Sequence, residues 1–141
     1  MDKSQPPKEL QFPEFHSAKA QYIEIDLREQ AGDRLTKIAR FGPLSAGDCV
    51  EVDGATLTQG SDGAATFDCV TFTNHTHSGD YWWAGFLLQD KDGVTLHDEP
   101  YHEGPRMDDG DPPPRYRWGF SFNFNPSIFN AITQVYYSFK C

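Results

Sequence analysis

A chain of 141 residues with 14% aromatic side chains has the length of one domain, which buries roughly two thirds of its unfolded surface without help from a metal or a disulfide. Its formal net charge of -9 repels both the nucleic-acid backbone and anionic lipid headgroups, so neither nucleic acid nor a membrane surface is an expected partner. The sequence has no apolar run of about 18 residues, which excludes a transmembrane helix.

Residues 1–15 contain three prolines and show no hydrophobic periodicity, which predicts an extended or disordered N-terminal arm. The arm has two alternatives. It stays in solvent, or it lies across an edge or the mouth of the domain, because Phe12 and Phe15 are unfavourable in water. Residues 16–141 are expected to form a single β domain, since turn residues recur between segments rich in β-branched and aromatic side chains.

The stretch from residue 16 to residue 41 fits two structures. Tyr22 to Leu27 alternates apolar and polar residues as a strand does, while residues 18–32 would also place their apolar residues on one face of a helix. We prefer the strand, followed by a turn at residues 30–33 and a second strand from Arg34 to Phe41.

Two turn-and-strand patterns follow. An Asp53-Gly54 turn separates a strand that begins at Cys49 from one that ends at Gln59. From Asp62 to Asp90, two long apolar arms are joined by a polar loop that contains two histidines, which predicts the central hairpin of the domain.

The next segment is rich in turn-forming residues. A tight turn at residues 91–93 leads into a short strand at residues 94–97. Residues 98–114 contain five prolines and six acidic residues, so we expect a long loop there, either a linker or a lid over a binding site. In the lid hypothesis, residues 101–107 close over an apolar pocket.

The C-terminal segment alternates clearly. Five aromatic residues at alternate positions from Tyr116 to Phe124 share one face of a predicted strand, which is therefore the core face. Asn125 and Pro126 have the residue types of a helix N-cap and first turn, and residues 133–140 form a last strand. Together these elements predict an all-β fold, a single-domain antiparallel β-barrel or sandwich with one short helix near the C-terminus.

The three cysteines, Cys49, Cys69 and Cys141, show no C-x-x-C spacing. The sequence begins without the apolar segment of a secretory signal, so we expect a cytoplasmic protein with three free thiols, or a secreted one if a leader has been removed.

Several short motifs resemble a family of small, mostly exported bacterial β-rich proteins of unassigned function, over about residues 41–141. The matching residues are Gly47-Asp48-Cys49, Ala55-Thr56-Leu57-Thr58, Asp62-Gly63-Ala64-Ala65-Thr66-Phe67, Trp83 with Leu87, Leu88, Asp90 and Gly93, Tyr116-Arg117-Trp118, and Ile128-Phe129 with Cys141. These are turn glycines and core aromatics, so the resemblance implies a shared fold and no catalytic residue. Export of the family members would permit a Cys49–Cys141 disulfide.

Candidate metal ligands are few. His75 and His77 have the spacing of a cupin metal pair, but Tyr81 and Trp82 stand where the cupin glutamate is needed. The sequence also lacks the motifs of serine hydrolases, phosphate-binding loops and zinc proteases. We therefore expect no metal and no cofactor.

The remaining polar and aromatic residues suggest a site for a small, largely apolar molecule in an aromatic-lined barrel cavity. The catalytic candidates are His102, His97 and Tyr116, and the ligand-binding candidates are Trp82, Trp83, Trp118, Tyr101, Arg117 and Phe120. Such a site suits a cofactor-independent cyclase or isomerase of specialised metabolism. The alternative is a non-catalytic acidic interaction module, an exported protein or a toxin inhibitor, and a homodimer is left open.

Overall fold

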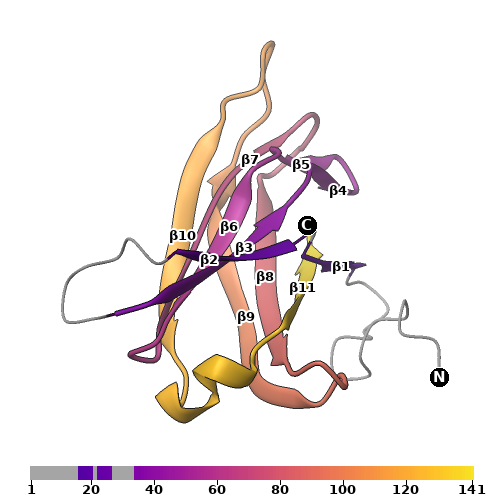
Figure 1. Ribbon diagram of the computed structural model, residues 1–141. Helices are drawn as coiled ribbons and strands as arrows, with labels where there is room; N and C mark the ends of the chain where they lie inside the picture. The colour runs from indigo at the N-terminus through magenta and orange to yellow at the C-terminus, as the bar shows by residue number, and fades with distance from the viewer. Residues whose placement is uncertain (1–15, 21, 27–33) are drawn as a thin grey trace.

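Two antiparallel sheets face each other and form a nearly closed β-barrel (Figure 1). The computed structural model describes residues 16–20, 22–26 and 34–141; the expected arm at residues 1–15 and the turn at residues 30–33 lie outside them. The elements are β1 (His16–Lys19), β2 (Tyr22–Asp26), β3 (Thr36–Phe41), β4 (Leu44–Ala46), β5 (Cys49–Glu51), β6 (Ala55–Gly60), β7 (Ala64–Thr73), β8 (Asp80–Gln89), β9 (Thr95–Met107), β10 (Tyr116–Asn123), the 3-10 helix η3 (Pro126–Ala131) and β11 (Gln134–Lys140).

The strand order explains how the barrel closes. One sheet has the order β1-β11-β8-β9, and the other has the order β2-β3-β6-β7-β5-β4 with β10 on the opposite edge of β7. β1 and β2 follow each other in the chain yet pair in different sheets, so this segment connects the two sheets on one side. β9 and β10 are the edge strands that meet on the other side.

The C-terminal predictions are confirmed. The aromatic face of β10 points inward, and the Asn125 side chain accepts a hydrogen bond from the Ser127 amide at 3.0 Å to cap η3. The preferred strand in the ambiguous N-terminal region is also confirmed, because β2 pairs with β3. β1 was not predicted.

The predicted central hairpin is wrong in its pairing. Its two arms are strands, β7 and β8, but β7 pairs with β5, β6 and β10, whereas β8 pairs with β9 and β11. The polar loop at residues 74–79 therefore crosses from one sheet to the other. The burial of both arms makes this arrangement favourable, because each sheet covers the apolar face of the other.

The Asp53-Gly54 turn does not pair its flanking strands either. β5 and β6 both lie along the same edge of β7, one after the other, and β5 pairs instead with β4. Gly54 has φ of 105°, which a side chain would disfavour, and its amide donates to the Phe41 carbonyl. The turn is thus a bend between β5 and β6, which follow each other along the same edge of β7.

Residues 98–107 are strand rather than loop, so the lid prediction is wrong. They form all but the first three residues of β9, at the edge of its sheet. Pro100 lies in a bulge between the pairs Glu99–Phe86 and His102–Ala84, and Pro105 lies in the next bulge towards the end of the strand. Edge positions and bulges are the places where a strand tolerates a residue without an amide hydrogen. Residues 108–114 are the part of the predicted loop that remains outside a strand.

The centre of the barrel is packed with aromatic rings. The Phe67 ring centroid lies 4.9 Å from that of Phe86 and 5.3 Å from that of Tyr137, so the rings of the two sheets meet. Phe41 packs against the same tyrosine at 5.1 Å. All four side chains are buried. Among the described residues, polar groups that a ligand could reach therefore lie at the edges of the barrel.

The expectation of three free thiols is wrong. Cys49 of β5 and Cys141, directly after β11, form a disulfide that links the two sheets across a separation of 92 residues. This is the pairing that the family resemblance implied, and Cys69 is free and buried. No helix in the described part of the chain is long and apolar enough to span a membrane.

Candidate functional site

The seam between β9 and β10 is the place where the barrel is held by side chains. In the described ranges β9 pairs with β8 and β10 pairs with β7, and no backbone ladder joins β9 to β10. The gap is filled by ring contacts: the imidazole of His97 lies parallel to the Phe122 ring at 5.5 Å, and that of His102 stacks on the Phe120 ring at 3.8 Å. Because no backbone hydrogen bonds close the seam, the polar side chains that lie there are accessible to solvent.

Glu99 joins the two histidines of the seam. Its Oε1 lies 2.9 Å from His97 Nε2 and its Oε2 lies 2.8 Å from His102 Nε2. The side chains of His97, Glu99 and His102 are 22%, 11% and 33% exposed, so the group is half-buried but reachable. We call these three residues the seam triad.

The bulge at Pro100 makes the triad possible. In a regular strand, residues five positions apart point to opposite faces, which would separate His97 from His102. The extra residue of the bulge restores His102 to the inner face, so that His97, Glu99 and His102 stand opposite Leu88, Phe86 and Ala84, the inward residues of β8.

The protonation of the triad follows from its hydrogen bonds. An ionised carboxylate can only accept, so each Nε2 atom must carry the hydrogen of its bond to Glu99. Nδ1 of each neutral imidazole is then the nitrogen with a free lone pair, which can accept a proton or bind a ligand. Each imidazole therefore offers one nitrogen that can accept a proton, on a ring that stacks on a phenylalanine.

The structure brings some of the sequence candidates together. His102, His97 and Phe120 meet at the seam. Trp118 lies next to them on β10, where a Cβ on Gly104 of β9 would come within 2.7 Å of its ring. Its indole nitrogen donates to the Thr71 hydroxyl at 3.0 Å.

The other candidates lie elsewhere. Tyr116 accepts a hydrogen bond from the Asp108 amide at 3.0 Å, in the loop after β9. Trp83 lies under the Lys140 ammonium, 5.9 Å from its ring, and a Cβ on Gly85 would come within 2.8 Å of the Tyr101 ring.

A second polar group lies inside the barrel. The indole nitrogen of Trp82 donates to the Tyr137 hydroxyl at 2.6 Å, and that hydroxyl donates to Oε1 of Glu51 at 2.7 Å. Glu51 is fully buried and its Oε2 has no hydrogen-bond partner. Burial raises the pKa of the Glu51 carboxyl to about 8, against the opposing effect of the Tyr137 hydrogen bond.

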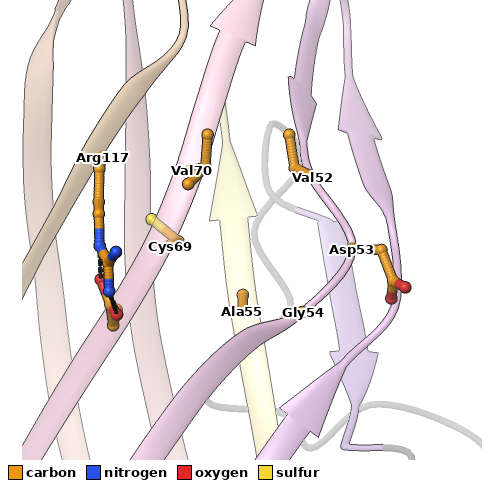
Figure 2. Close-up of a pocket in the computed structure, with 8 residues that line it drawn as sticks. Val52, Asp53, Gly54, Ala55, Cys69, Val70 and Arg117 are labelled. Carbon is orange, nitrogen blue, oxygen red and sulfur yellow. Dashed lines mark hydrogen bonds and ion pairs between the residues drawn. The ribbon is translucent and has the colours of Figure 1, made fainter.

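A surface pocket of about 140 Å³ lies where the chain bends between β5 and β6 (Figure 2). It is lined by Val52, Asp53, Gly54, Ala55, Asp68, Cys69, Val70 and Arg117. Arg117 donates from both Nε and an Nη to Asp68, with the shorter contact at 2.7 Å. The pocket is smaller than the roughly 300–1,000 Å³ of typical small-molecule sites, and burial raises the pKa of the Cys69 thiol, which is therefore unreactive.

Two groups could offer metal ligands. The imidazoles of His75 and His77 pack edge to face at 4.9 Å, and His75 Nδ1 lies 3.8 Å from Asp109. Within the described residues, a second group consists of Cys49, Asp80 and Cys141, whose possible metal-ligating atoms all lie within 4.8 Å of one another.

The comparisons with known proteins show a family and no established activity. No curated protein and no solved structure is significantly similar to the chain. The sequence model of DUF6294, a family of unknown function, matches residues 56–141, which is more than half of the chain. These residues include β7 to β11 and the whole seam triad. The chain belongs to the DUF6294 family of unknown function.

Proposed function

We propose that the protein binds a small, largely apolar molecule at the β9–β10 seam and moves protons on it, as a cofactor-independent isomerase or cyclase of specialised metabolism. The observation that carries this proposal is the seam triad, in which one carboxylate orients two half-exposed imidazoles beside aromatic rings. Aromatic surface beside Phe120 and Trp118 provides contact for a flat apolar ligand.

The reaction needs only what the triad supplies. In an isomerisation, one proton leaves an acidic C–H bond and another is returned to a different atom of the substrate, so no oxidant or cofactor is required. His102, the more exposed histidine, takes the proton on Nδ1 and then returns a proton to the other atom of the substrate, so that it is neutral again at the end of the reaction. Glu99 stabilises the intermediate imidazolium, and His97 holds the other oxygen of this carboxylate. A cyclisation uses the same proton transfers when the resulting carbanion adds to a carbonyl carbon of the same molecule and the alkoxide formed takes the returned proton.

Proton exchange on a simple ketone tests the proposal. 2-Tetralone is a flat apolar molecule with acidic C–H bonds, and its uptake of deuterium from D2O can be followed by NMR. The wild-type protein should accelerate exchange above the rate in buffer, and His102→Ala and Glu99→Gln should each lower that rate about 100-fold, as is typical for loss of a general acid–base group. His75→Ala, which removes an exposed imidazole on the loop at residues 74–79, is the matched control and should have no effect.

Exchange equal to that in buffer, or equal loss in the His75→Ala control, would remove the support for catalysis at the seam. In that case the acidic interaction module becomes the better proposal, and a basic partner that dissociates at high salt would be its support. For localisation, the Cys49–Cys141 disulfide supports the secreted alternative, because such bonds persist in oxidising compartments.

A further inference from the structure

The end of the barrel near the loop at residues 74–79 carries three donor atoms that come from three different strands or strand ends. Cys49 Sγ in β5 lies 3.6 Å from Asp80 Oδ2 at the start of β8, and Cys141 Sγ is bonded to Cys49. All three donor atoms lie within 4.8 Å of one another. Cys49 is buried, Asp80 is half-buried and Cys141 is exposed, so the cluster is open on one side.

The Asp80 carboxylate is held in place beside the sulfur atoms. The Thr73 hydroxyl donates to its Oδ2 at 2.7 Å, and the Thr76 hydroxyl donates to its Oδ1 at 3.2 Å. The Thr76 hydroxyl in turn accepts the Gly79 amide at 2.9 Å. None of the ion pairs seen in the described part of the chain involves Asp80. A carboxylate that is oriented by hydroxyls and lacks a cation has the outer-shell support that metal-binding carboxylates show.

We propose that reduction of the Cys49–Cys141 disulfide converts this cluster into a zinc site, with Cys49 Sγ, Cys141 Sγ and the Asp80 carboxylate as ligands. A dithiol supplies two electrons and two protons, which gives two cysteine thiols and the cyclic disulfide of the reductant. Zinc then displaces the two thiol protons to solvent and binds the thiolates.

The ligand set suits zinc better than the hard cations. Two thiolates and one carboxylate, with a fourth position open to solvent, match the three-ligand zinc sites, whereas calcium and magnesium prefer oxygen ligands alone. In tetrahedral coordination the two sulfur atoms stand roughly 3.8 Å apart. Cys141 follows the last residue of β11 and lies outside its ladder, so a small shift of this residue opens the space.

Cobalt(II) binding tests the site without any assay of activity. The full chain is reduced with dithiothreitol, desalted without oxygen and titrated with Co²⁺, whose thiolate charge-transfer band and visible tetrahedral bands report the ligands. One equivalent should bind to the reduced protein and be displaced by Zn²⁺, and the oxidised protein should show no bands. Asp80→Asn, which keeps an acceptor for the Thr73 hydroxyl, should weaken binding at least tenfold.

A matched control uses the third cysteine. Cys69→Ser removes a buried thiol away from the cluster and should bind Co²⁺ as the wild type does. The reduced chain in urea controls for loss of fold, since a denatured chain binds metal without any requirement for Asp80. Absence of the bands in the reduced protein, equal affinity in Asp80→Asn, or loss of binding in Cys69→Ser would each overturn the proposal.

Discussion

The buried carboxyl of Glu51 should make the stability of this protein fall as the pH rises through neutrality. Glu51 is fully buried, accepts one hydrogen bond from Tyr137 and has no partner for Oε2. Burial raises its pKa from 4.5 to about 8, so the folded protein carries a proton on Glu51 at neutral pH and the unfolded chain does not. Replacing Glu51 by Gln removes this titration and keeps an oxygen that can accept from Tyr137.

The size of the effect follows from the change in pKa. Below pH 4.5 the carboxyl is protonated in both states, and its contribution to stability is fully present. Between pH 4.5 and about 8 the folded state binds more protons than the unfolded state, so the free energy of unfolding falls with rising pH. At about 1.4 kcal/mol per pKa unit, the total loss is about 5 kcal/mol. Burial also raises the pKa of Tyr137 and of Cys69, so neither group titrates in this range.

Urea denaturation of the oxidised wild type and of Glu51→Gln, at a series of pH values from 4 to 9, measures the effect. The difference between the two unfolding free energies should change by about 5 kcal/mol over the range, with Glu51→Gln gaining relative stability at high pH. The other titrating groups are the same in both proteins, so their contributions cancel in this difference. Glu103→Gln, at an exposed position of β9, should show a constant difference. A constant difference for Glu51→Gln as well would refute the argument that this carboxyl is protonated in the folded barrel.

Three further substitutions test the fold. Cys49→Ser should lower the free energy of unfolding by about 4.6 kcal/mol, the loop entropy expected for a 92-residue closure, and alkylation of the unfolded wild type should label Cys69 alone. Lys37→Met should cost about 3 kcal/mol by chemical denaturation, since Lys37 Nζ donates at 2.6 and 2.8 Å to two backbone carbonyls at η3. Gly119→Ala should cost about 1–3 kcal/mol in thermal melts, because its Cβ would overlap the Phe67 carbonyl on β7, and an unchanged melt would contradict this close approach.

The elements that were predicted well are those specified by neighbouring residues. The alternation from Tyr116 to Phe124 is a local pattern, and the cap of η3 depends on Asn125 and the two residues after it. Such patterns identify a strand or a helix start without knowledge of the rest of the fold. They also identify the face that is buried, which is why the aromatic face of β10 was assigned correctly.

Strand pairing could not be predicted in the same way. The alternation in β7 and β8 shows which residues point inward, but an inward face is buried equally well whether the next strand lies beside it or in the opposite sheet. The Asp53-Gly54 dipeptide likewise specifies a change of direction and not the partner of each strand. The disulfide depended on the same missing information, because Cys49 and Cys141 meet only when β5 and β11 face each other across the barrel.

The seam triad depends on a strand of which only the first few residues could be predicted from the sequence. Pro100 and Pro105 argue against a strand in the middle of a sheet, so Glu99 fell within a predicted loop and was not connected to His97 and His102. At the edge of a sheet the same prolines are tolerated, and they prevent β9 from offering a continuous row of amides to β10. Residues that break a regular strand therefore have two effects here. They leave the seam without a ladder, and the bulge at Pro100 turns His102 inward. A proline-rich acidic segment next to an aromatic strand is therefore better tested first as a bulged edge strand than as a lid.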